Sequence, residues 1–178
     1  MQDTFIEYMV KKRNPLKITL LKVGVALAGA LVAIFAMMVS PFLGAFSFLG
    51  VLLAAGALYG AYILITSQNI EFEYSLTNGE MDVDKITAQR KRKRLISLKF
   101  KDVEDFGQYK ASEHENKQYQ TKIIACDHPE SDDLWFCSLH YKDKGMTLLV
   151  FNASERMLEG LKPYLPRPIF HRLFNARG

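Results

Sequence analysis

The sequence lacks charge over one long internal stretch. No Asp, Glu, Lys or Arg occurs from Val23 to Ile70, and this stretch separates the first 22 residues from a tail of 108 in a chain of 178. The part that remains for a water-soluble fold is one compact domain of about 100 residues at most. A soluble enzyme of two domains is therefore excluded.

A strong excess of positive charge is also absent. The net charge is +4, and the tail contributes only +1 of it, from 18 basic and 17 acidic residues. Dedicated nucleic-acid-binding domains carry a clearly basic face or stripe. Nucleic acid is therefore not expected as a partner.

The uncharged stretch predicts a transmembrane helical hairpin. A hydrocarbon core of about 30 Å needs roughly 20 apolar residues per helix. Ser40-Pro41 interrupts the stretch, because proline removes a backbone donor and disfavours helix at the preceding residue. We expect spans at residues 18–39 and 42–66, so that the chain divides into a head (1–17), the hairpin (18–66) and a domain (67–178).

Positive charge indicates how the hairpin is oriented. Basic residues flank only its outer ends, in the head and in the run Arg90–Arg94, whereas the turn at Ser40-Pro41 has none. Under the positive-inside rule both termini lie in the cytoplasm, and the chain is a multi-pass protein of the cell membrane. Lys22 is expected at the membrane edge, with its ammonium group among the headgroups. In the cytoplasm Cys126 and Cys137 are expected as free thiols.

Small residues in the second span predict close helix packing. Gly56 and Gly60 have the small-xxx-small spacing, which Gly50 and Ala54 extend towards the turn. Lipid gives little hydrophobic drive for helices to associate, so small residues that permit backbone contact matter more than in water. These residues either pack the hairpin against itself or form the seam of a homodimer.

The tail predicts a small antiparallel β domain closed by a C-terminal helix. Apolar and polar residues alternate from Ile70 to Leu76, and Asn78-Gly79 supplies the positive φ angles of a two-residue hairpin turn. Asn152 is expected to cap a helix over residues 153–165, with Glu155 completing a capping box. Further strands are expected at residues 94–100, 121–126, 134–141 and 146–151.

This arrangement resembles a pleckstrin-homology-like (PH-like) domain, in which a C-terminal helix plugs one end of a bent sheet. The head, the hairpin, FEYSLTNGEMDVDKI followed by RKRKR, and VFNASERMLEGLKPYLPR are together similar to an uncharacterised family of small bacterial membrane proteins with such a domain, over almost the whole chain. The resemblance implies an α+β membrane protein whose PH-like domain interacts with protein or lipid near the membrane. It implies no catalysis and no cofactor.

The run Arg90–Arg94 is the strongest local charge signal, and it has two interpretations. Its members are candidates for binding anionic lipid headgroups or a protein partner, because a basic residue near a bilayer contributes about 1 kcal/mol of attraction. These candidates are Arg90, Lys91, Arg92, Lys93 and Arg94. Alternatively, outward side chains of the run neutralise four carboxylates that the register of the β-hairpin at Asn78-Gly79 places on one face. These are Glu71, Glu73, Asp82 and Asp84. We favour neutralisation, and replacement of Lys91 and Lys93 is expected to test it.

No metal site is expected. Cys126, His128, Cys137 and His140 have the side chains of zinc ligands, but their spacing lacks a paired C-x2-C knuckle. Strand alternation also places Cys137 and His140 on opposite faces. The four carboxylates lack a calcium-binding loop.

Both ends of the chain are candidate membrane-surface segments. An apolar stripe is expected to lie on the membrane above Lys11–Arg13, and it consists of Phe5, Ile6, Met9 and Val10. Near the C-terminus apolar residues alternate with basic ones over 169–177, and this segment either lies on the membrane or packs on the β domain.

The sequence therefore predicts a non-enzymatic module, anchored in the lipid bilayer, with an interaction or regulatory role at the cytoplasmic face. The alternative is a subunit of a membrane transport or envelope complex. A small membrane-bound hydrolase is the third hypothesis, because histidines and clustered acids are present.

Overall fold

The computed structural model describes residues 5–175 and divides into two compact units. The helical unit comprises Arg13–Ile70 together with Thr87–Arg90. The β unit comprises the chain up to Lys12, the segment Glu71–Ile86 and the chain from Lys91 onward. The two units therefore alternate along the sequence.

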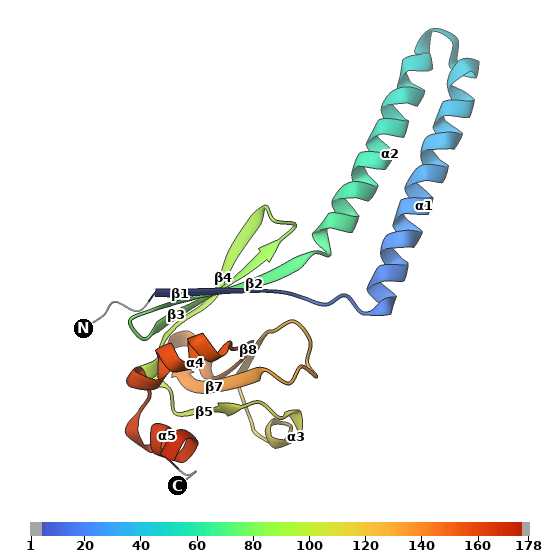
Figure 1. The fold of residues 1–178 in the computed structure, drawn as a ribbon. Helices are drawn as coiled ribbons and strands as arrows, with labels where there is room; N and C mark the ends of the chain where they lie inside the picture. Colours follow the sequence, from blue (N-terminus) through green and yellow to red (C-terminus); the bar gives the residue numbers. More distant parts are fainter. Residues whose placement is uncertain (1–4, 176–178) are drawn as a thin grey trace. The chain divides into compact units, whose positions relative to one another are not determined.

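The helical unit consists of two helices that lie side by side (Figure 1). Helix α1 (Leu16–Val39) ends at the residue before Ser40-Pro41, and α2 (Ser47–Ser67) follows the 3-10 turn η1 (Ser40–Phe46). The hydroxyl of Ser40 donates to the carbonyl of Ser47 over 2.6 Å, and Gly44 has a φ of +54°. These features reverse the chain within a few residues.

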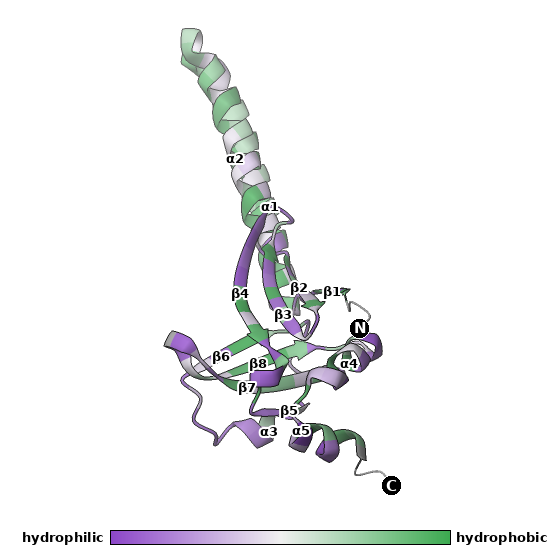
Figure 2. Ribbon diagram, turned by 90° about the vertical axis from the view of Figure 1, so that its left-hand side faces the viewer, coloured by the Kyte–Doolittle hydropathy of each residue, from purple (hydrophilic) through white to green (hydrophobic). Residues whose placement is uncertain are grey.

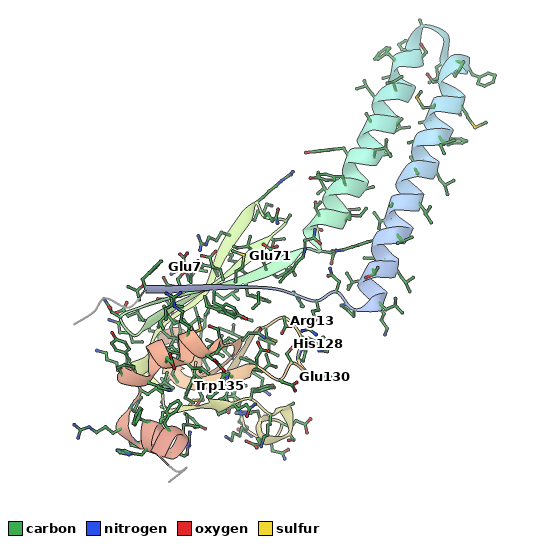
Figure 3. All side chains as sticks on the ribbon, viewed as in Figure 1. Glu7, Arg13, Glu71, His128, Glu130 and Trp135 are labelled. Carbon is green, nitrogen blue, oxygen red and sulfur yellow. The ribbon has the colours of Figure 1, made fainter. Side chains whose placement is uncertain are left out.

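The helical unit is largely hydrophobic along both helices (Figure 2), and its apolar side chains project outward from them (Figure 3). Leu31 and Phe35 of α1 are 67% and 68% exposed, and Leu52 and Leu64 of α2 are 62% and 58% exposed. By length and composition, Leu16–Ser67 is one segment apolar enough to cross a membrane, and only 17% of its most apolar window is buried. A core helix of a soluble protein is mostly buried, which this segment is not.

The first sheet of the β unit, sheet A, contains four strands in the order β1-β2-β3-β4. These strands are β1 (Phe5–Lys11), β2 (Ile70–Thr77), β3 (Glu80–Thr87) and β4 (Lys91–Lys99). The predicted turn is confirmed between β2 and β3, where Asn78 and Gly79 have φ values of +49° and +82°. A Cβ atom at position 79 would lie 2.4 Å from Cγ of Tyr164, so glycine also permits the contact with that ring.

Strand β1 overturns the prediction of an apolar stripe on the membrane surface. Phe5–Lys11 pairs antiparallel with β2 over its whole length, from Phe5 opposite Thr77 to Lys11 opposite Glu71. Ile6 and Val10 are buried, whereas Phe5 and Met9 are exposed. The prediction was wrong because a short apolar segment fits both helical and strand spacing, and the partner strand lies about 60 residues away in the sequence.

The second sheet, sheet B, has the order β5-β7-β8-β6. Its strands are β5 (Asp105–Gln108), β6 (Thr121–Ala125), β7 (Leu134–Tyr141) and β8 (Gly145–Asn152). Strand β7 has its predicted bounds, but β5 and the short helix α3 (Ala111–His114) were not predicted. The expectation of a purely antiparallel domain is wrong at β6, which pairs parallel with β8.

Aromatic and aliphatic side chains join the two sheets in one core. Tyr74 of sheet A is fully buried, packs 5.9 Å from the ring of Phe151 of sheet B, and its hydroxyl contacts the carbonyl of Ala125. The 3-10 turns η2 (Phe100–Asp102) and η3 (Lys142–Lys144) lie in the connections that follow β4 and β7. Phe100 of η2 is fully buried.

The C-terminal helix differs from the prediction at both ends. Helix α4 (Glu155–Leu161) is capped by Ser154, whose hydroxyl accepts from the Met157 amide, and it buries Met157 and Leu161. The predicted cap Asn152 is instead the last residue of β8. Pro163 shortens the helix, and the chain continues through η4 (Lys162–Tyr164), α5 (Arg167–Phe170) and the π turn η5 (His171–Asn175).

Candidate functional site

The basic run lies on β4 and on the turn before it, and two of its arginines bind the carboxylates of sheet A. Arg92 donates through Nε to Oδ2 of Asp84 over 2.9 Å, and its Nη2 contacts Glu73 on β2. Arg94 lies with Nε 2.5 Å from Oδ1 of Asp84 and Nη1 2.7 Å from Oδ2 of Asp82. Arg92 and Arg94 therefore hold carboxylates from both other strands of the β2–β3–β4 ribbon.

Asp84 is the centre of this ion-pair network. Its side chain is only 5% exposed, whereas those of Arg92 and Arg94 are about half exposed. Burial raises the pKa of Asp84, but the hydrogen bond and charge of Arg94 and the charge of Arg92 outweigh burial, so the pKa lies below its usual value. The carboxylate is therefore held ionised by the two arginines.

The side chains of β4 do not alternate regularly between the two faces of the sheet along the whole strand. Arg92 and Arg94 contact the carboxylates of β3, yet Ile96 and Leu98 at the same spacing are buried in the core. Regular alternation would put all four side chains on one face, so it breaks between Arg94 and Ile96. In this interval Lys144 donates to the carbonyl of Leu95 over 3.2 Å.

Lys91 and Lys93 lie on β4 on either side of Arg92. Both are exposed, and among residues 5–175 neither makes an ion pair with an acidic side chain. Arg92 and Arg94 therefore neutralise the carboxylates. Lys91 and Lys93, whose replacement was expected to test this neutralisation, do not take part in it. The reason is alternation, which turns neighbouring side chains of a strand to opposite faces.

Arg90 belongs to the helical unit. Its guanidinium lies 5.7 Å from the centre of the Tyr62 ring on α2, and its Nη2 donates to the Tyr62 hydroxyl over 3.3 Å. The amide of Ala88 donates to the carbonyl of Asn69 over 2.8 Å, and Lys22 of α1 donates to the side chain of Asn69, also over 2.8 Å. Polar and basic groups therefore gather where α2 ends.

The predicted helix-packing residues fall into two pairs. Gly50 and Ala54 face α1, since a Cβ atom on Gly50 would lie 2.5 Å from Cβ of Ser40 and 2.8 Å from the carbonyl oxygen of Ala36. Gly56 and Gly60 have no atom within 4 Å of an added Cβ, so they do not pack the hairpin against itself. Gly29 of α1 also packs closely, although it was not predicted, since an added Cβ would lie 2.8 Å from Cβ of Ala61.

The candidate zinc ligands do not assemble. In the part of the chain that the structure describes, no three His, Cys, Asp or Glu side chains form a group that could hold a metal ion. Cys137 is fully buried and His140 is exposed, on opposite faces of β7. Burial raises the pKa of the Cys137 thiol, and burial with the charge of Asp127 raises that of Cys126 to about 11. Neither thiol is activated as a nucleophile.

Comparison with protein families matches residues 2–171 to the family described as bacterial PH-like domain (DUF6106). The chain belongs to this bacterial PH-like family. The match covers the helical unit as well as both sheets, so the helices are part of what defines the family. Comparison with curated proteins and with solved structures gave no match. PH-like domains are generally non-catalytic, which supports a role in interaction.

The PH-like fold also contains one buried histidine that the sequence did not reveal. His114 of α3 is 2% exposed, stacks on Tyr109, meets the ring edge of Phe136 and shares a 2.8 Å hydrogen bond between Nδ1 and the Tyr119 hydroxyl. Its Nε2 is buried with no hydrogen-bond partner in the described chain. Burial, with a smaller effect of the Lys117 charge, lowers the pKa of His114. A lone His in a polar loop gave no sequence signal for this burial.

Proposed function

We propose that this PH-like protein is a membrane-anchored, non-enzymatic interaction or regulatory module at the cytoplasmic face of the cell membrane. The helical segment is the proposed anchor and crosses the bilayer twice. Two features support anchoring, namely the exposed apolar surface of α1 and α2 and the length of Leu16–Ser67. An apolar surface of this extent is unfavourable in water.

The position of the helical segment in the sequence, between two paired strands of sheet A, is the observation that carries the proposal. The helical segment leaves the sheet after β1 and returns at β2, and these strands are paired with Lys11 opposite Glu71. Both ends of the segment therefore start from neighbouring strands of one folded sheet. A segment that begins and ends on the same side of a bilayer crosses it an even number of times, and two helices of 24 and 21 residues fit two crossings.

The polar groups at the end of α2 support the proposal that this end of the helix lies at the headgroup level of the membrane. Lys22 bonds to Asn69, and Arg90 stacks over Tyr62. Tyrosine and long basic side chains are enriched at the headgroup level, where the ring or aliphatic stem meets lipid and the polar tip meets water. The positive-inside rule then assigns this end, and with it both termini, to the cytoplasm.

Lys91 and Lys93 are the proposed contact with an anionic partner. Arg92 and Arg94 already bind carboxylates, whereas the two lysines are exposed and lack such pairs among the described residues. Anionic lipid headgroups, or an acidic surface of another membrane protein, have the complementary charge. Because Arg92 and Arg94 bind carboxylates of the sheet, Lys91 and Lys93 are the residues of β4 in this run that remain available to an anionic ligand.

A second candidate function follows from Gly56 and Gly60 of α2. Their open faces, with no atom within 4 Å of an added Cβ, match the small-xxx-small surface on which another transmembrane helix packs closely. On this hypothesis the protein is a subunit of a membrane transport or envelope complex, and the β unit positions it. Both functions share the same anchor.

Alkaline extraction and reporter fusions test the anchor. We expect the full chain to stay in the membrane pellet at alkaline pH and to give cytoplasmic reporter activity at both termini. Release by alkaline extraction, or an exported reporter at Gly178, would overturn the proposal. Purification of the full chain in mild detergent then separates the two roles, because a stoichiometric partner lost on Gly56→Leu indicates a subunit, whereas retained anionic lipid lost on Lys91→Gln/Lys93→Gln indicates the module.

A further inference from the structure

Strand β1 is the less charged of the two longer sheet edges in the described chain, and helix α4 contacts it. The edge strands of the two sheets are β1, β4, β5 and β6. Natural sheets protect edges by shortness, charge or irregularity, since an edge exposes unpaired N–H and C=O groups. Strand β4 carries the basic run and an interrupted alternation, and β5 and β6 have only four and five residues. Strand β1 has seven residues without proline, and its Phe5 and Met9 are 59% and 53% exposed.

Two unpaired charges of opposite sign flank Met9 on the same face of β1. Glu7 and Lys11 are both exposed, and among residues 5–175 neither makes an ion pair, although Lys11 lies opposite Glu71. Alternation puts Phe5, Glu7, Met9 and Lys11 on the face away from the buried Ile6 and Val10. Figure 3 shows Glu7 at this exposed strand. The edge therefore has the pattern Glu, Met, Lys at alternate positions.

This pattern is complementary to itself in one antiparallel register. In a twofold pair that continues the sheet, residues of the same face lie opposite each other. A twofold axis at Met9 puts Glu7 opposite Lys11 of the second copy at both ends, with Met9 opposite Met9 between them. Opposite charges across a strand pair stabilise it.

Two other registers of β1, with the axis at Glu7 or at Tyr8, lack this complementarity. An axis at Glu7 puts the two Glu7 carboxylates opposite each other, and like charges in directly opposite positions are destabilising. An axis at Tyr8 puts Glu7 opposite Met9 and Lys11 opposite Phe5, so that each charge faces an apolar side chain. An axis at Val10 pairs only residues 9–11 of β1 with each other, so the Met9-centred register is the favoured one.

We propose that two copies of this chain pair through β1, antiparallel and with the twofold axis at Met9, to form one continuous sheet. The ladder hydrogen bonds satisfy the edge of both copies, and two Glu7–Lys11 pairs set the register. The occupant of the edge is thus a second copy of the same chain. This interface is separate from Gly56 and Gly60 and stands whether or not those residues meet another helix.

Cysteine cross-linking of the full chain in lipid vesicles tests the register. Opposite residues of an antiparallel pair have Cα atoms about 4.5–5.5 Å apart, which is within the range for a disulfide. Met9→Cys is therefore expected to form a disulfide-linked dimer on mild oxidation. Ile124→Cys on the edge strand β6 is the matched control, because Ile124 is 54% exposed, and it is expected to give no dimer above the wild-type chain. The native Cys126 and Cys137 are both buried.

Charge reversal tests the specificity of the pairing. In the Met9→Cys chain, Glu7→Lys or Lys11→Glu alone is expected to reduce the dimer yield several-fold, and the double reversal is expected to restore it. A mixture of Glu7→Cys and Lys11→Cys chains is expected to cross-link more than either chain alone. Equal yields for Met9→Cys and Ile124→Cys, or a double reversal no better than the single ones, would overturn the proposal. The fluorescence of Trp135, the only tryptophan, verifies that each variant is folded.

Discussion

Arg94 holds the carboxylate of Asp84 with two of its guanidinium nitrogens. Nε lies 2.5 Å from Oδ1, and Nη2 lies 3.2 Å from Oδ2. A two-point contact of this kind fixes orientation as well as charge. Since Asp84 is nearly buried, loss of the arginine leaves a carboxylate with less compensation than in the native sheet.

Arg94→Gln is therefore expected to lower the free energy of unfolding of the β unit by about 1–2 kcal/mol, a range between exposed pairs and hydrogen bonds to charged groups. Lys93→Gln, which removes the same charge at the neighbouring position, is the control and is expected to leave the stability unchanged. Thermal unfolding of the full chain in detergent, followed by Trp135 fluorescence, measures both. Equal effects of the two variants would contradict the assignment of neutralisation to the arginines.

Asn152 is expected to matter more for stability than the helix cap itself. Its Oδ1 accepts from the Asp127 amide over 2.9 Å, and its Nδ2 donates to Asp127 and Asp133 over 2.8 and 2.9 Å. Asn152→Ala removes all three bonds and is expected to cost about 2–3 kcal/mol, whereas Ser154→Ala removes one cap bond and is expected to cost about 1 kcal/mol. A larger loss of stability for Ser154→Ala than for Asn152→Ala in thermal unfolding would contradict this prediction.

His114 is expected to make the β unit less stable in mild acid. A histidine with a lowered folded pKa contributes full stability above its unfolded pKa, near 6.5, and loses it as the pH falls towards the folded pKa. The melting temperature of the wild type should fall between about pH 7 and pH 5.5, and that of His114→Phe should fall less, because phenylalanine does not titrate. An equal fall of the melting temperature for the wild type and His114→Phe would contradict this assignment.

Substitutions in the turn between β3 and β4 are expected to raise the stability of the protein. Ala88 and Gln89 have φ values of +54° and +55°, a conformation that is unfavourable for residues with a Cβ atom. Asn-Gly is the preferred pair for such a two-residue turn, as found at Asn78-Gly79. Ala88→Asn/Gln89→Gly is therefore expected to raise stability by about 1 kcal/mol. A lower melting temperature of the double variant would contradict the turn geometry.

Gly50 and Gly56 are expected to respond differently to the same small substitution. Gly50→Ala introduces a Cβ atom 2.8 Å from a backbone oxygen of α1 and should separate the helices, while Gly56→Ala meets no atom within 4 Å. Helical unfolding by far-ultraviolet circular dichroism in detergent is expected to show a lower transition for Gly50→Ala only. Equal transitions would show that α1 and α2 do not pack through Gly50.

Local patterns in the sequence determined the features that depend on neighbouring residues. The lack of charge from Val23 to Ile70 marks most of the helical segment, because apolar composition and length are read directly from consecutive residues. Alternation over Ile70–Leu76 and the Asn78-Gly79 turn determined the β2–β3 hairpin, and β7 has its predicted bounds. These elements are specified by short-range sterics and periodicity.

Only the tertiary structure decided which distant segments meet. Strand β1 finds its partner β2 across the whole helical segment, and β6 lies parallel to β8 at the edge of sheet B. The same holds for side chains, since Asn152 binds the loop at Asp127 rather than a helix end, and Arg94 rather than a lysine reaches Asp84. Periodicity states which face a residue occupies within its own element. The physical reason is that the partner across that face is set by the packing of remote elements, about which local spacing carries no information.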